Sequence, residues 1–209
     1  MENNNLLYVF LGWSLAIAGQ VVTDSIRKDY KKRDLKVLIF SELKDIGFRL
    51  GAVRSKIQTH LGIKDRKAYE QLRTIYQKFG TDEKDVQVID EFLKATDEQI
   101  EVVTNLNKAK EGIGLSLKKY SLFSTGSILD NLHLFDSAFQ RDILEIKFQM
   151  SIFNEEVENA MFYHRLTFDP TAVGANKDII HKNVNDICMN IISVCERIIT
   201  KIENALEKV

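Results

Sequence analysis

Residues 39–57 read IFSELKDIGFRLGAVRSKI, and the spacing of their apolar side chains decides the fold class. The apolar positions alternate between steps of four and three residues: Ile39, Leu43, Ile46, Leu50, Val53 and Ile57. This spacing places them on one face of an α-helix, as in the seam of a coiled coil. Gly62 is predicted to end this helix, because glycine readily adopts the left-handed conformation found after a helix C-terminus.

The segment after Gly62 is also predicted to be helical. Asp65 is a suitable N-cap for a short helix that ends at Gly80. A long helix is then predicted from Thr81 or Asp82 to Leu117, because apolar residues recur at helical spacing along it.

The last third of the chain predicts two more long helices. After a loop at residues 121–127, apolar spacing indicates a helix over residues 128–166 and another from Asn176 to near the C-terminus. The sequence therefore predicts an all-α protein whose body, residues 27–209, is an elongated antiparallel coiled-coil-like bundle of about four long helices. If these helices do not close on one another, a homo-oligomer must supply the missing partner.

Composition narrows the functional classes. The 209 residues include one proline and ten glycines, which leaves room for long helices, and the net charge is −1. A chain without a basic excess lacks the electrostatic footprint of a nucleic-acid binder, so no nucleic-acid partner is expected. The two cysteines, Cys188 and Cys195, indicate a reducing compartment and are interpreted as small buried residues.

Residues 1–26 form the most apolar segment, and no charged residue lies between Asn3 and Thr23. Its large apolar side chains are Leu6, Leu7, Phe10, Leu11, Trp13, Leu15, Ile17, Val21 and Val22. The 21 residues from Leu6 to Ile26 would form a helix of about 31 Å, which matches the hydrocarbon core of a bilayer. The alternatives are a cleaved signal peptide, which normally has a basic start, and a buried core helix. We predict a single-pass transmembrane anchor.

A basic collar follows the apolar segment directly. It consists of Arg27, Lys28, Lys31, Lys32, Arg33 and Lys36. Basic residues beside a membrane helix stay on the cytoplasmic side, so the N-terminus is predicted outside the cell membrane and the body in the cytoplasm. The same collar is suited to anionic lipid headgroups.

No nucleotide-binding, hydrolase or metalloprotease motif is present, and no cofactor is expected. The strongest candidate polar group lies at the turn between the last two helices, where His164 ends one helix and Asp178 and His181 begin the next. It is interpreted as a polar cluster that fastens one end of the bundle, or alternatively as a metal or pH-sensitive site.

A second candidate pair is Arg54 and His60. Their Arg-x(5)-His spacing resembles the Arg-x(4–6)-His pattern of the HEPN ribonucleases, which are also helical. The resemblance implies RNA cleavage by these two residues, usually at a dimer interface. It covers only two positions, and Ser55 departs from the polar amide or acid often found beside the arginine.

These observations predict a membrane-tethered, non-catalytic helical bundle that acts by protein–protein interaction, as a scaffold, adaptor or regulator. Its expected partners are the lipid bilayer and an unidentified protein. One alternative is a membrane-localised HEPN-like ribonuclease or toxin-like effector. A further alternative is a membrane-perturbing or pore-forming effector that assembles through the anchor.

Overall fold

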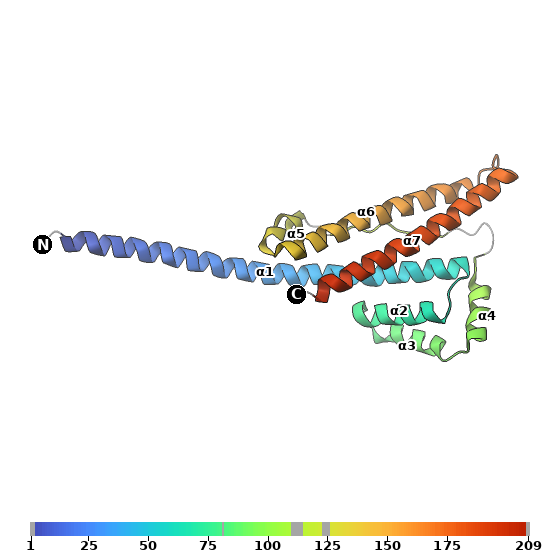
Figure 1. Ribbon diagram of the computed structural model, residues 1–209, viewed down its shortest axis with the longest axis horizontal. Helices are drawn as coiled ribbons and strands as arrows, with labels where there is room; N and C mark the ends of the chain where they lie inside the picture. Colours follow the sequence, from blue (N-terminus) through green and yellow to red (C-terminus); the bar gives the residue numbers. More distant parts are fainter. Residues whose placement is uncertain (1–2, 81, 110–114, 123–125, 208–209) are drawn as a thin grey trace.

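The computed structural model describes residues 3–80, 82–109, 115–122 and 126–207, and the side chains of residues 3–9 and 126–127 lie outside that description. Within the described residues the chain forms seven α-helices, one 3-10 helix and no strand (Figure 1). The elements are α1 (Asn3–Leu61), α2 (Arg66–Phe79), α3 (Glu83–Leu93), α4 (Asp97–Asn107), α5 (Gly126–Asp130), η1 (Leu132–Leu134), α6 (Ser137–Leu166) and α7 (Ala175–Glu207). The predicted all-α fold is confirmed.

Helix α1 is one continuous rod of 59 residues that joins the apolar N-terminal segment to the predicted coiled-coil seam. It ends as predicted, because Gly62 has a positive φ of 71°. The first half of α1 projects beyond the other helices, while its second half packs against α2 and α7 (Figure 1).

The main core lies among α1, α6 and α7. Helices α1 and α6 run in the same direction and α7 runs back between their ends (Figure 1). Ile39, Ile143 and Ile191, one from each helix, are completely buried. The three seams are therefore covered within one chain, so the condition that would require an oligomer does not arise for these helices.

The predicted long helix over residues 82–117 is wrong. Helix α3 ends at Leu93, and α4 begins after Thr96, whose hydroxyl accepts the Gln99 N–H while the Gln99 side chain accepts the Thr96 N–H. This reciprocal cap stabilises a new helix start and outweighs the continuing apolar periodicity. Residues 110–114, which the same prediction included, lie outside the described residues.

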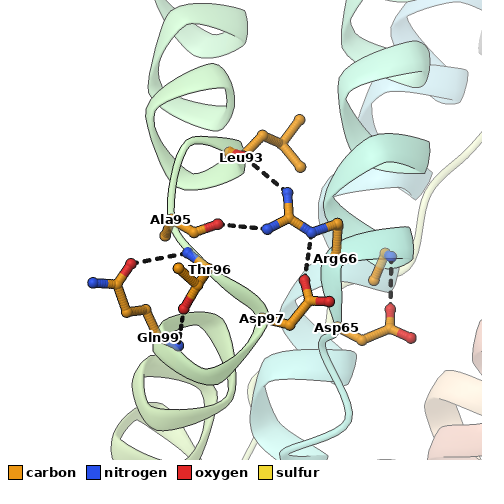
Figure 2. Close-up of polar contacts among 8 residues, drawn as sticks. Asp65, Arg66, Leu93, Ala95, Thr96, Asp97 and Gln99 are labelled. Carbon is orange, nitrogen blue, oxygen red and sulfur yellow. Dashed lines mark hydrogen bonds and ion pairs between the residues drawn. The ribbon is translucent and has the colours of Figure 1, made fainter.

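Arg66 at the start of α2 holds the break between α3 and α4 (Figure 2). Its guanidinium donates to the backbone carbonyls of Leu93 (2.9 Å) and Ala95 (2.5 Å) and to the Asp97 carboxylate (2.5 Å). One side chain thus pairs two carbonyls that the end of α3 leaves without helical partners. As a result α2, α3 and α4 form a small lobe with its own core of Tyr69, Leu72, Ile89 and Ile100.

The bundle has three long helices instead of about four, and an extended segment, residues 115–122, lies along them. We call this segment the strap. The Tyr120 N–H donates to Asn154 Oδ1 (3.0 Å), and Asn154 Nδ2 donates back to the Tyr120 carbonyl (2.8 Å). Leu117 and Leu122 are buried in the main core, so the strap takes the place of the missing helix.

The predicted helix over residues 128–166 is divided near its start. Asp136 accepts the Phe139 N–H as the N-cap of α6, and this hydrogen bond holds the pKa of the Asp136 carboxyl below its usual value. A carboxylate at this position competes with continuation of the preceding turn, which explains the separate α5 and η1.

Other local predictions are confirmed. Asp65 caps α2 by accepting the Ala68 N–H, and both cysteines are buried.

Helix α2 packs closely on α1 because Gly47 and Gly51 have no side chain: a Cβ at Gly51 would lie 2.6 Å from a methyl carbon of Ile75.

Among the described residues, no helix combines the length and the apolar character needed to cross a membrane. The predicted transmembrane span is therefore corrected for this part of α1, where Gln20 interrupts the apolar run and charged residues begin at Asp24. The side chains of the predicted anchor residues Leu6 and Leu7 lie outside the described residues.

Candidate functional site

The first candidate site is the projecting part of α1, residues 3–34, which we call the arm. Among the α1 side chains that the structure describes, residues 10–61, the first buried one is Leu35, so the described arm side chains contribute none of the buried core. Leu15 is 72% exposed and Trp13 is 63% exposed. The other described anchor residues are also exposed: Phe10, Leu11, Ile17, Val21 and Val22.

Large apolar side chains cover more than half of the circumference of the arm. Consecutive residues of an α-helix point about 100° apart. Phe10 and Val21 therefore share one face, Leu11 and Val22 share a second face, and Trp13 lies on the other side of Phe10. A helix that is apolar around most of its circumference suits an apolar surrounding better than a single packing partner.

The basic collar lies where the arm joins the bundle. Arg27, Lys28, Lys31 and Arg33 are exposed. Lys32 lies over the Phe135 ring at 5.8 Å, and Lys36 lies over the Phe40 ring at 5.5 Å. The Lys32–Phe135 contact joins the collar to the segment that follows η1, whereas the Lys36–Phe40 contact lies within α1. The remaining cations face solvent.

The second candidate site is a cavity of about 470 Å³ at the other end of the bundle. It is bounded by the end of α1, the end of α6, the start of α7 and the chain around Lys108 and Leu115–Leu117. Its polar walls carry three of the four histidines, His60, His164 and His181. We call it the histidine cavity.

The electrostatics of the histidine cavity disfavour positive charge on His60. Burial lowers the pKa of His60, and the nearby His164 and Lys56 lower it further. The Nε2 atom of His164 is buried and makes no hydrogen bond with the described residues. Cys188 also lines the cavity, but burial raises its pKa to about 11, so the thiol stays protonated and is a poor nucleophile near neutral pH.

The structure brings the predicted group His164, Asp178 and His181 to one cavity. Among the described residues, however, no three histidine, cysteine, aspartate or glutamate side chains are placed to hold a metal ion. Sequence analysis did not connect His60 and Lys108 with this group. The position of His60 beside this group follows from the topology, since α1 and α6 run in the same direction and end on the same side of the bundle.

Arg54 and His60 line different cavities. Arg54 is only 5% exposed and lies between α1, α2 and α7. Its guanidinium donates to Gln71 Oε1 and pairs with Glu196 at 2.9 Å. Six residues along an α-helix correspond to a rotation of about 240°, so His60 points away toward His164. Within one chain the two residues of the HEPN-like pair do not converge.

The comparisons with known proteins assign no role to the arm or to either cavity. No family model, no curated protein and no solved structure matches this chain.

Proposed function

We propose that this chain is a helical bundle tethered to a membrane by its arm, with the bundle on the cytoplasmic side, and that it acts by binding another protein there. The observation that carries the proposal is the arm itself. It projects from the bundle with its described apolar side chains uncovered, and Leu15 and Trp13 are more than 60% exposed. Such a surface is costly in water and favourable in lipid.

The basic collar is evidence both for membrane attachment and for the orientation of the bundle. Its exposed cations follow the apolar residues directly, at the place where lipid headgroups would lie if the arm were inserted. Each basic residue near a membrane surface contributes roughly 1 kcal/mol of attraction to anionic lipid, and anionic lipid gives the cytoplasmic leaflet its negative surface potential. The bundle would then lie in the cytoplasm, next to the membrane.

A protein partner is supported by an apolar pair on the outside of α6. Leu144 and Phe148 are one turn apart, and they are 53% and 62% exposed. A large exposed aromatic beside an exposed leucine is typical of a protein contact surface. The pair lies on the half of α6 nearer the arm, so a partner there would also be close to the membrane.

Membrane flotation of the full-length chain tests the tether. The test variant is Leu15→Arg in the arm, and the matched control is Val37→Arg, because Leu15 and Val37 are 72% and 71% exposed on the same helix. The wild-type chain and Val37→Arg are expected to float with vesicles of mixed neutral and anionic lipid. The membrane-bound fraction of Leu15→Arg is expected to be at least tenfold smaller than that of the wild type.

Equal flotation of both variants, or no flotation of the wild type, contradicts the tether. The partner is tested separately by chemical crosslinking in intact membranes. One discrete crosslinked species is expected for the wild type, and Phe148→Glu should remove it without changing flotation. A chain that floats but forms no crosslinked species disproves the protein-binding role and leaves the tether standing.

A further inference from the structure

The histidine cavity contains more cationic and hydrogen-bond-donating groups than carboxylates. Its titratable lining residues are His60, His164, His181, Lys108, the protonated thiol of Cys188 and one carboxylic acid, Asp178. Lys108 reaches the cavity across Gly62, where its aliphatic stem lies against the glycine. An anion that accepts hydrogen bonds would complement these groups, whereas a further cation would be repelled by them.

Two observations show that the polar wall is incompletely paired. His164 Nε2 is buried without a hydrogen bond to the described residues, a state that is unfavourable for a polar atom. His164 and Lys56 both oppose the protonation of His60. An anion beside these imidazoles would supply the missing acceptor and reverse that opposition.

Other lining residues of the cavity are apolar. Leu61, Leu115, Leu117 and Val184 line the same cavity, and its volume of about 470 Å³ falls within the usual range for small-molecule sites. A ligand that satisfies both kinds of lining residue therefore has one anionic group and an apolar part. Inorganic phosphate would leave the leucines without a contact, and a neutral hydrocarbon would leave His164 Nε2 without a hydrogen bond.

We propose that the histidine cavity binds a small organic anion, a carboxylate attached to a short chain or a ring, with the carboxylate among His60, His164 and His181. The site is independent of the membrane tether, because it lies at the end of α1 opposite the arm. Occupation would join the ends of α1 and α6 to the start of α7.

NMR of the histidine rings tests the proposal in the full-length chain held in lipid nanodiscs. The probes are benzoate and hexanoate, with benzyl alcohol, hexanol and inorganic phosphate as comparisons. The fourth histidine, His133, is exposed on η1 and acts as an internal control. Saturable shifts of the three cavity histidines, with His133 unmoved, are the expected result for at least one carboxylate.

Three variants locate the binding. His164→Leu is expected to weaken the carboxylate at least tenfold, and His133→Gln is expected to change it less than twofold. Val184→Phe keeps all four histidines but fills the apolar wall, so it should also block binding while the chain stays folded by circular dichroism. The proposal is overturned if neither carboxylate gives saturable shifts, if the alcohols or phosphate bind as tightly, or if both histidine variants bind like the wild type.

Discussion

At the scale of single residues, Arg54 is the most consequential charge in the bundle. Its side chain is 7% exposed, whereas the side chain of its partner Glu196 is 49% exposed and can regain water. Arg54→Ala removes the buried hydrogen bond to Gln71 and the packing of the aliphatic stem. A loss of about 2–4 kcal/mol in the free energy of unfolding is expected, measured by urea titration.

The control for Arg54 is Arg49, on the same helix. Arg49 pairs with Asp45 at 2.7 Å, but both side chains are at least half exposed. Exposed pairs of this kind contribute little, so Arg49→Ala should cost less than about 1 kcal/mol. Equal costs for the two variants would mean that burial does not determine the contribution of Arg54.

His60 makes stability depend on pH in a defined direction. Burial, His164 and Lys56 lower the pKa of His60 in the folded chain, so the unfolded chain holds that proton more tightly. The stability associated with neutral His60 is complete above the unfolded pKa of about 6.5 and is lost as the pH falls below that value. His60→Gln should flatten the decline in unfolding free energy between pH 7.5 and pH 5.5.

The matched control for this pH series is His133→Gln, which changes an exposed histidine outside the cavity. The unfolding free energy of this variant should decline between pH 7.5 and pH 5.5 as steeply as that of the wild type. If His60→Gln declines as steeply as the wild type and His133→Gln, the environment of His60 is not the source of the acid sensitivity.

At the scale of elements, Asn154 of α6 pairs with the backbone of the strap at Tyr120. Asn154 pairs with both the N–H and the carbonyl of Tyr120, as a neighbouring strand would. Asn154→Ala leaves both backbone groups unpaired and should cost about 1–3 kcal/mol. Hydrogen exchange is the decisive measurement, because the Tyr120 amide should lose its protection more than the amides of the α7 core.

Ser151 provides the comparison for Asn154. It lies about one turn earlier on α6, is exposed, and bonds only to the Phe148 carbonyl of its own helix. Ser151→Ala should leave the exchange of the Tyr120 amide unchanged. Faster exchange in both variants would show that α6 as a whole, and not the Asn154 side chain, holds the strap.

The accuracy of sequence prediction differed between elements for physical reasons. Helices α1 and α7 were predictable because their apolar seams continue without a competing cap. The 82–117 prediction failed because the reciprocal Thr96–Gln99 cap and the distant Arg66 outweigh a periodicity that slips near Leu106. Pairing of the strap with Asn154 depends on residues 34 apart and leaves no local periodic pattern.

The residues of the candidate sites also differ in how far they could be predicted from the sequence. His164 and His181 were predictable as neighbours, because one turn separates their helices. His60 joins them through the three-dimensional arrangement alone, and its sequence spacing to Arg54 pointed to a different partner. The exposure of the arm side chains at residues 10–34 required the structure, since sequence alone also allowed a buried helix.

At the scale of the whole molecule, the arm and the bundle are energetically separate. The described arm side chains lie outside the main core, which begins on α1 at Leu35. Deleting residues 1–26 should therefore change the free energy of unfolding by less than about 0.5 kcal/mol. In contrast, ending the chain after Arg197 removes the fully buried Ile198 and Ile202 and should cost more than about 4 kcal/mol.

Urea titrations of the two truncated chains measure this difference, and near-ultraviolet circular dichroism reports whether the core stays packed. The separation bears on the proposed tether, because an arm that contributes nothing to folding could enter or leave lipid without unfolding the bundle. A large loss of stability on deleting residues 1–26 would show that the arm packs against the bundle, and its apolar surface would then be explained by folding instead of by lipid.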